Sequence, residues 1–155
     1  MTEFSLIDVA ETPYLYVDRE TGMAMAEIGE AMGSAFAEVW AFMQKHGVPP
    51  AGAALAVYYD YSPDRMAFRA GFTIARDDMA AAEAPVKADV TPAGRVAHGM
   101  HRGSYAGLQA AYGEMAAFVQ AQGVDFAPPT WEVYLNSPDE VPEEQLLTGL
   151  YQALA

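Results

Sequence analysis

The sequence contains no cysteine among its 155 residues. This excludes a disulfide framework, a thiolate nucleophile and a thiolate metal site, and it fits a reducing compartment. No apolar run approaches the roughly 18 residues that a membrane-spanning helix needs, and the N-terminal residues lack the basic and apolar segments of a signal peptide. We therefore expect a soluble, cytoplasmic protein that has no membrane partner.

Basic residues are also scarce. Eight lysines and arginines stand against 21 aspartates and glutamates, which gives a formal net charge of −13. A protein that binds nucleic acid needs a basic stripe to neutralise phosphates, and this chain has none. We therefore expect no nucleic-acid partner for this chain alone, whereas its acidity attracts cations and keeps it in solution.

The motifs of several common enzyme sites are missing as well. The sequence has no Gly-x-Ser-x-Gly, no Gly-x-Gly-x-x-Gly and no glycine-rich phosphate-binding loop. It therefore lacks the standard motifs for a nucleophilic serine and for nucleotide binding. His98 and His101 are three residues apart and would face opposite sides of a strand, with no third ligand near them in the sequence. We predict no metal site and no cofactor.

What the sequence does contain is an internal repeat. The segment Glu38–Val48 returns as Glu114–Val124, 76 residues later, and Tyr58 returns as Tyr134 at the same offset. Ala56, by contrast, is replaced in the second copy by Glu132. This predicts one domain, residues 1–155, with two pseudo-symmetric halves and one asymmetric acid in a shared cleft. The expected parts are repeat one (about 4–76), a linker (77–85) and repeat two (about 86–155).

The hydrophobic periodicity predicts the same β-α-β-β order in both halves. Apolar residues spaced three and four apart indicate a helix from Met25 to Gly47 and another that Ser104 caps and that Gly123 and Pro128-Pro129 end. We expect an α+β fold in which the two repeats form one antiparallel sheet, with both helices on one face and a ligand cleft between the repeats. The predicted strands cover 4–9, 14–20, 54–61, 66–76, 86–91, 95–101, 130–136 and 146–154, with a turn at 62–64.

Strand alternation then assigns the residues of 130–136 to two faces. Glu132 and Tyr134 point one way, and Trp131 points the other way with Val133 and Leu135. The bulky apolar set suits the helix side, so we predict that Glu132, Tyr134 and Tyr58 project from the free face toward a common concavity. Trp131 would then form a floor beneath Glu132. The alternatives are a solvent-facing glutamate and tyrosines that belong to the ordinary core.

At this point the sequence resembles a known family, the GyrI-like small-molecule-binding domain, which also forms the effector-binding part of AraC-type and MerR-type regulators. The likeness spans about residues 5 to 154. It departs from the family where Gly-Pro-Tyr and Asn-Asp-Pro are often found, because this chain has Ser104 and Ser137 there. The residues that carry it are Gly103-Ser104-Tyr105, Leu108, Ala111-Tyr112, Trp131-Glu132-Val133-Tyr134-Leu135-Asn136, Pro142-Glu143-Glu144 and Leu146.

The resemblance implies two β-α-β-β repeats, an aromatic-lined cleft between them, and an acid at Glu132 that meets amphipathic, often cationic ligands. Because the likeness begins near Met1 and ends near Ala155, no segment remains for a DNA-binding helix-turn-helix, and we expect a stand-alone form. The expected ligand-binding residues are Glu132, Tyr134, Tyr58, Tyr105, Tyr112 and Trp131.

Three functions follow as hypotheses. The first is binding of a hydrophobic, cationic small molecule, with Glu132 as counter-ion and aromatic faces adding cation–π attraction. The second is hydrolysis of strained, cyclopropane-bearing electrophiles, which some GyrI-like proteins perform; Glu132 and Tyr134 would then be the acid–base residues. The third is a gyrase-inhibitor-like module that binds an unknown protein partner.

Overall fold

The computed structural model describes residues 2–59 and 64–155, so part of the expected strand 54–61 and of the turn at 62–64 lies outside the described residues. Within these residues the chain forms eight strands, two α-helices and three short 3-10 helices. Their order is β1 (Phe4–Val9), β2 (Pro13–Gly22), α1 (Met25–His46), β3 (Ala54–Tyr58), β4 (Arg65–Thr73), η1 (Arg76–Ala81), β5 (Lys87–Val90), β6 (Gly94–Arg102), η2 (Tyr105–Gly107), α2 (Leu108–Ala121), β7 (Phe126–Tyr134), η3 (Glu143–Gln145) and β8 (Leu147–Leu154).

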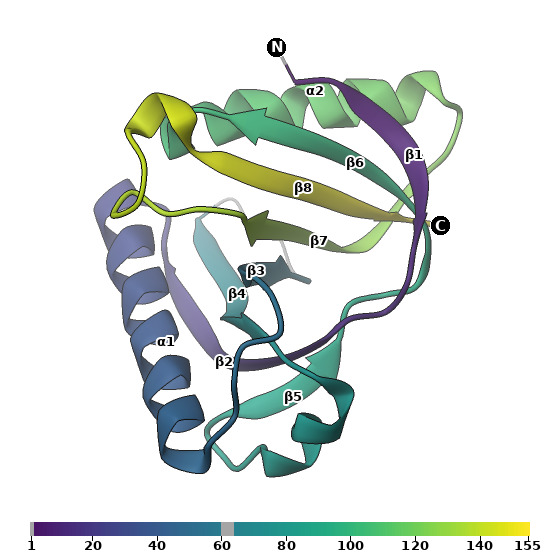
Figure 1. Ribbon diagram of the computed structural model, residues 1–155. Helices are drawn as coiled ribbons and strands as arrows, with labels where there is room; N and C mark the ends of the chain where they lie inside the picture. Colours follow the sequence, from purple (N-terminus) through teal and green to yellow (C-terminus); the bar gives the residue numbers. More distant parts are fainter. Residues whose placement is uncertain (1, 60–63) are drawn as a thin grey trace.

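All eight strands belong to one sheet, in the order β1-β6-β8-β7-β3-β4-β2-β5, and every described pairing is antiparallel. The two halves of the chain meet at its centre, where β3 pairs with β7 and Ala56 lies opposite Glu132. Helix α1 packs on β2 and β4, and α2 packs on β6. Both helices lie along the outer side of the curved sheet (Figure 1), which confirms the predicted α+β architecture.

The two helices bury the stripes that the sequence indicated. Helix α1 buries Ala35, Val39 and Met43, and it ends at His46. Its cap residue, Gly47, has a left-handed backbone (φ 68°), and the Gly47 N–H bonds to the Met43 carbonyl. The second helix differs from the prediction at its start. Ser104 caps η2 by accepting the N–H of Ala106, and α2 begins only at Leu108. A 3-10 turn therefore separates the cap from the helix.

The sequence suggested that Pro128 and Pro129 help to end the second helix. In the structure both prolines belong to strand β7. Proline cannot donate to a sheet ladder, so it is tolerated at a strand's start or at an irregularity. The pairing of β7 with β8 shifts register between Phe126 and Thr130, the interval that holds both prolines. Regular pairing resumes at Thr130, which positions the residues that follow.

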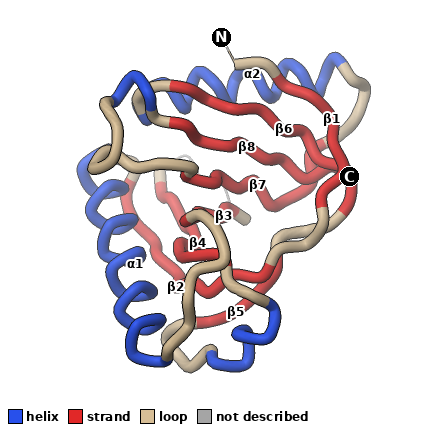
Figure 2. The backbone as a smooth tube through the Cα atoms, in the orientation of Figure 1, coloured by secondary structure: helices blue, strands red, loops and turns tan. Residues whose placement is uncertain are grey.

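The prediction of which face Glu132 occupies is wrong. Glu132 pairs with Ala56 on one side and with Leu150 on the other, and these two residues belong to the cores under α1 and α2. Trp131 faces away from the helices, in a separate cluster with Tyr14, Tyr16, Leu55, Val57, Val96 and Ala153. Bulky residues failed to mark the helix side because the sheet, whose curvature can be followed in Figure 2, also buries large side chains on its other face. Glu132 therefore lies beneath the helices.

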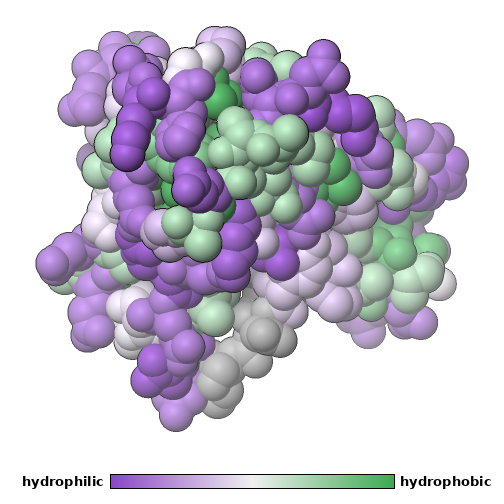
Figure 3. Space-filling model, turned by 90° about the horizontal axis from the view of Figure 1, so that it is seen from below, coloured by the Kyte–Doolittle hydropathy of each residue, from purple (hydrophilic) through white to green (hydrophobic). Residues whose placement is uncertain are grey.

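The surface seen from below is mainly hydrophilic, with hydrophobic residues gathered near its middle and toward its right edge (Figure 3). This mixture agrees with the large excess of acidic side chains in the sequence. Among the helices of the described residues, none is both long and apolar enough to cross a lipid bilayer.

Gly71 is required where β4 pairs with β2. A Cβ added there would lie 1.7 Å from the Leu15 carbonyl oxygen, which is backbone and cannot turn aside. We expect Gly71→Ala to lower the free energy of unfolding by about 3 kcal/mol or more. Gly29→Ala in α1 is the matched control, because a Cβ there meets nothing within 4 Å and alanine favours a helix. Urea denaturation of both variants measures this; equal stabilities would contradict it.

Candidate functional site

Glu132 is a buried carboxylate at the centre of the sheet, on the face that the helices cover. Its exposed fraction is 5%. Two tyrosine hydroxyls donate hydrogen bonds to it: Tyr112 of α2 bonds to Oε2, and Tyr134 of the same strand bonds to Oε1 at 2.6 Å. Alternation along β7 brings Tyr134 to the same face, and α2 supplies Tyr112 from above. Each carboxylate oxygen therefore has one neutral donor.

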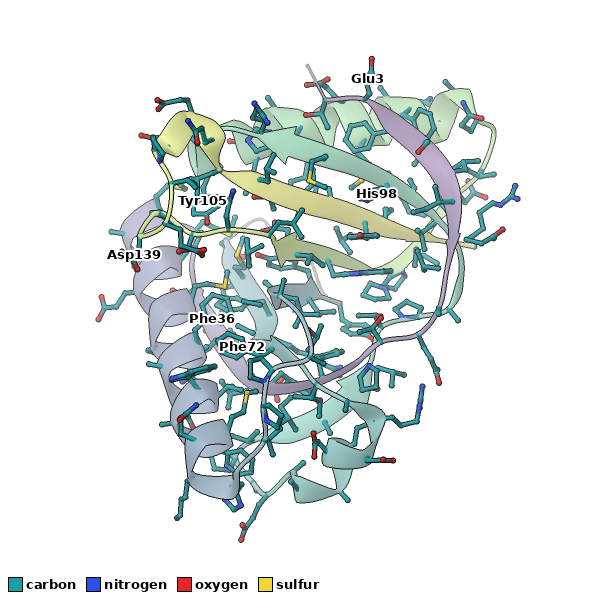
Figure 4. All side chains as sticks on the ribbon, viewed as in Figure 1. Glu3, Phe36, Phe72, His98, Tyr105 and Asp139 are labelled. Carbon is teal, nitrogen blue, oxygen red and sulfur yellow. The ribbon has the colours of Figure 1, made fainter. Side chains whose placement is uncertain are left out.

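Aromatic contacts from both halves hold Tyr134 in position. Its ring meets Phe36 of α1 at a centroid distance of 6.0 Å and an interplanar angle of 84°, and it meets Tyr105 of η2 at 5.9 Å and 75°. Figure 4 shows Phe36 between α1 and the sheet, near Phe72, and Tyr105 beside the loop that follows β7. Edge-to-face pairs of this kind are favourable for aromatic rings. Tyr134 is thus held in the orientation that its hydrogen bond to Glu132 needs.

Burial raises the pKa of Glu132 above its usual range, because the ionised form loses its hydration. The hydrogen bonds from Tyr112 and Tyr134, and the nearby His101, act in the opposite direction by favouring the carboxylate. Burial and the Glu132 charge together raise the pKa of Tyr134 well above its usual value, so this hydroxyl keeps its proton. Ionisation of Glu132 therefore costs free energy in this site, where the direct partners of the carboxylate are neutral hydroxyls.

A cavity of about 630 Å³ opens onto Glu132. Residues of both halves line it, Tyr58 and Met66 from the first and Tyr112 and Met115 from the second, and its surface is mainly apolar. Two large apolar side chains at its edge are half exposed, Met23 at 45% and Phe126 at 48%. The repeat suggested one acid in a cleft shared by the halves; the cavity is lined by both halves, but it opens on the face that the helices cover and not on the free face.

The other predicted site residues differ in what they contact. Tyr58 and Tyr112 line the cavity with Glu132, whereas Tyr134 supports Glu132 through its hydroxyl and Tyr105 packs on Tyr134. Trp131 is on the opposite face, stacked on Tyr151 at 5.2 Å and 4°. Trp131 does not line the cavity. The prediction that it binds ligand or forms a floor beneath Glu132 is therefore wrong, because its side chain is buried on the opposite face of the sheet.

Sequence reasoning missed several cavity residues. Thr130, two residues before Glu132 on β7, and Gln152, which lies opposite Thr130 on β8, form a buried polar pair on the same face. The alternation of β7 does assign Thr130 to the face of Glu132, but no pattern connects Gln152 with either residue. Three methionines also line the cavity, Met23, Met66 and Met115. Their role could not be predicted from the sequence, because methionines at such positions resemble ordinary core residues.

No metal centre emerges from the part of the chain that the structure describes, since no three His, Asp or Glu side chains cluster there. His98 and His101 lie on opposite faces of β6, as their spacing indicated. His98 stacks on Tyr151 at 4.4 Å, and the Nε2 atom of His101 lies 2.9 Å from the Ser104 carbonyl on the helix side.

Tyr134→Phe is expected to lower the free energy of unfolding by about 1–3 kcal/mol at a pH at which Glu132 is ionised, because it removes one donor from a buried carboxylate. It should also raise the Glu132 pKa further, since the lost bond favours the charged form. Urea denaturation measures the stability. Tyr151→Phe on the opposite face is the control, and equal effects of the two changes would count against a role for the Tyr134 hydroxyl.

Comparison with known proteins adds to this geometry. A family model described as the GyrI-like small molecule binding domain matches residues 2–154. A search of curated proteins found no significant match. Among solved structures, the chain is similar to the C-terminal domain of EcmrR, with a TM-score of 0.78, 14% identity, and coverage of 100% of this chain and 98% of that one.

Three further structures share the fold. The chain covers 57% of the EcmrR chain in a cryo-EM complex with DNA, with 99% of its own length aligned, a TM-score of 0.82 and 14% identity. A hydrolase from Listeria innocua aligns with a TM-score of 0.66 and 17% identity, over 99% of this chain and 92% of that one. SAV2435 bound to tetraphenylphosphonium aligns with a TM-score of 0.60 and 12% identity, over 99% and 94%.

Proposed function

Since the chain belongs to the GyrI-like small-molecule-binding domain family, we propose that it binds hydrophobic cations in the cavity between its two halves, with Glu132 as the counter-ion. The observation that carries this proposal is the buried Glu132 carboxylate, which has tyrosine hydroxyls but no cation as its direct partners among the described residues. A cytoplasmic location and the absence of nucleic-acid binding by this chain alone remain predictions.

The energetics favour a cation over a neutral ligand. An ionised carboxylate without a cation is costly in an apolar site, and the raised pKa of Glu132 reflects that cost. A positive ligand removes this cost by pairing with the charge. The rings of Tyr58 and Tyr112 line the same cavity and can add cation–π attraction of about 0.5–2 kcal/mol each.

The shape of the cavity suits a ligand with a large apolar body. Methionine side chains are flexible and polarizable, so Met23, Met66 and Met115 can adapt to different apolar outlines. The similarity to SAV2435, whose structure contains tetraphenylphosphonium, supports a lipophilic cation as the class of ligand. The similarity to EcmrR extends over its C-terminal domain and supports an effector-binding role.

Titration calorimetry with tetraphenylphosphonium and with neutral triphenylphosphine oxide tests this proposal. Both compounds carry phenyl rings on phosphorus, but only the first is charged. We expect the cation to bind at least about tenfold more tightly, because only the cation compensates Glu132. Equal affinities, or binding of the neutral compound alone, would defeat the proposal.

Hydrolysis of a strained electrophile is the second candidate. Glu132 has a raised pKa and a direct contact with the Tyr134 hydroxyl, so it could exchange a proton with a substrate while water attacks. The likeness to a Listeria innocua hydrolase also favours this class. Incubation with a cyclopropane-bearing electrophile separates the two functions: product that disappears in Glu132→Gln supports an enzyme, and unchanged substrate supports binding alone.

A further inference from the structure

We propose that the cavity selects cations that carry N–H groups, namely protonated amines, over cations without them, and that it recognises a second hydrogen-bond donor on the same ligand. This inference rests on the proposed function, because it concerns the same cavity. It follows from the direction of the hydrogen bonds around Glu132 and Gln152, which leave the cavity with acceptors to offer.

The first acceptor is Glu132. An ionised carboxylate accepts about four hydrogen bonds and donates none. Tyr112 occupies one position on Oε2, and Tyr134 occupies one on Oε1. The donor capacity of both hydroxyls is consumed by these bonds, whereas the carboxylate retains about two positions that a ligand can fill.

The second acceptor is the side-chain oxygen of Gln152. The Nε2 group donates to two backbone carbonyls, Ala127 at 3.0 Å and Ala153 at 3.2 Å. These two carbonyls fix the orientation of the amide, since a carbonyl oxygen in that position would meet two other acceptors. The Oε1 atom therefore faces Thr130, whose hydroxyl donates to it. Both N–H groups of Gln152 are committed to the protein, and Oε1 has capacity for one more donor.

The two acceptors belong to one site. Gln152 lies opposite Thr130 in the sheet, and Thr130 is two residues before Glu132 on the same face of β7. Residues two apart on a strand are separated by about 6–7 Å. Both side chains are buried and line the same cavity, with exposed fractions of 5% for Glu132 and 6% for Gln152. A ligand with an ammonium group and a hydroxyl or amine at that spacing can reach both.

This pattern discriminates between cations of equal charge. A protonated amine compensates Glu132 and also donates to its remaining positions, whereas a quaternary ammonium group supplies charge alone. A ligand that buries a carbonyl or an ether oxygen meets two acceptors when Glu132 is ionised, since Gln152 commits both its N–H groups to backbone carbonyls. The basic residue at the edge of the cavity, Arg65, is exposed and ion-paired with Glu20.

Matched ligands test the inference with the unchanged protein. Dibenzylammonium and dibenzyldimethylammonium share one apolar body and one charge, but only the first has N–H groups. Titration calorimetry is expected to show binding about tenfold to a hundredfold tighter for dibenzylammonium. Adding a para-hydroxyl to one ring should tighten binding about threefold to tenfold more, and the corresponding methyl ether, which cannot donate, should lose that gain.

The variant Gln152→Met tests whether Gln152 is the acceptor for the second donor of the ligand. This variant should lose the gain from the para-hydroxyl and retain the preference for dibenzylammonium, whereas Gln120→Met on the exposed side of α2 should change neither. If Gln152→Met does not fold, the comparison of hydroxyl with methyl ether in the unchanged protein still tests whether a second donor is recognised, and equal binding of the two ligands would overturn that part of the inference. Equal binding of dibenzylammonium and its quaternary analogue would overturn this inference and leave the proposed function intact. Failure of every cation to bind would overturn both.

Discussion

Glu132→Gln should weaken the binding of tetraphenylphosphonium by about two to three orders of magnitude. Removing one partner of a desolvated ion pair costs about 3–5 kcal/mol, because the other charge is left buried without compensation. The change is small in volume, and the amide can still bond to the hydroxyls of Tyr112 and Tyr134. Titration calorimetry of the two proteins measures the loss directly.

Two controls separate this local effect from a general one. Neutral triphenylphosphine oxide should lose no affinity in Glu132→Gln, because it does not use the charge of Glu132. Glu143→Gln removes the same charge from an exposed position outside the cavity, and it should leave cation binding within about twofold, since exposed charges are screened by solvent and salt. If Glu132→Gln lost as much affinity for the neutral ligand as for the cation, or if Glu143→Gln lost as much affinity for the cation as Glu132→Gln does, Glu132 would not be the counter-ion.

Cation binding should strengthen as the pH rises, by up to about tenfold per pH unit below the pKa of Glu132 in the unliganded protein. Burial raises that pKa above the ordinary value of 4.5, so the empty site is protonated at a pH where a solvated glutamate is ionised. A permanent cation such as tetraphenylphosphonium binds the ionised form, and binding must therefore release a proton. Above the raised pKa the affinity should level off.

Calorimetry across pH, in buffers with different ionisation enthalpies, measures both the affinity and the protons released. Glu132→Gln is the reference, because its affinity should not depend on pH in this range. If the unchanged protein and the variant showed parallel pH profiles, Glu132 would not be the titrating group.

Stability without ligand should change in the opposite direction. A group whose pKa is raised by folding contributes stability that is fully present below its unfolded-state pKa and is lost as the pH rises through the folded-state pKa. The free energy of unfolding of the unliganded protein should therefore fall relative to Glu132→Gln as the pH increases past about 4.5. Urea denaturation at several pH values checks this, and a constant difference between the two proteins would contradict it.

Local patterns in the sequence predicted much of the architecture correctly. Strand β1 (Phe4–Val9) agrees with its predicted range, and helix α1 begins at Met25 and ends before Gly47 as its apolar stripe indicated. These features depend on the periodicity of neighbouring side chains and on glycine geometry, which act over a few residues. The single acid of the second repeat, Glu132, was also visible from the sequence.

The faces of the sheet were assigned wrongly for a reason that lies outside local pattern. Alternation shows that Trp131 and Glu132 point in opposite directions, but it does not show which direction meets the helices. The sheet curves enough to bury Trp131 and Tyr16 on the side without helices. Apolar bulk then marks both faces equally, so the face that Glu132 occupies could not be inferred.

By itself, the sequence determined the repeat, the two helical stripes and the presence of one unmatched acid, since each can be read from the order of the residues without knowing which distant strands pair. Only the tertiary structure decided that the acid is buried and hydrogen-bonded. Its environment comes from α2, β3 and β8, whose contributions Tyr112, Ala56 and Leu150 are brought to Glu132 by the pairing of distant strands. The pKa of a carboxyl depends on that assembled environment, and so does its capacity to hold a cation.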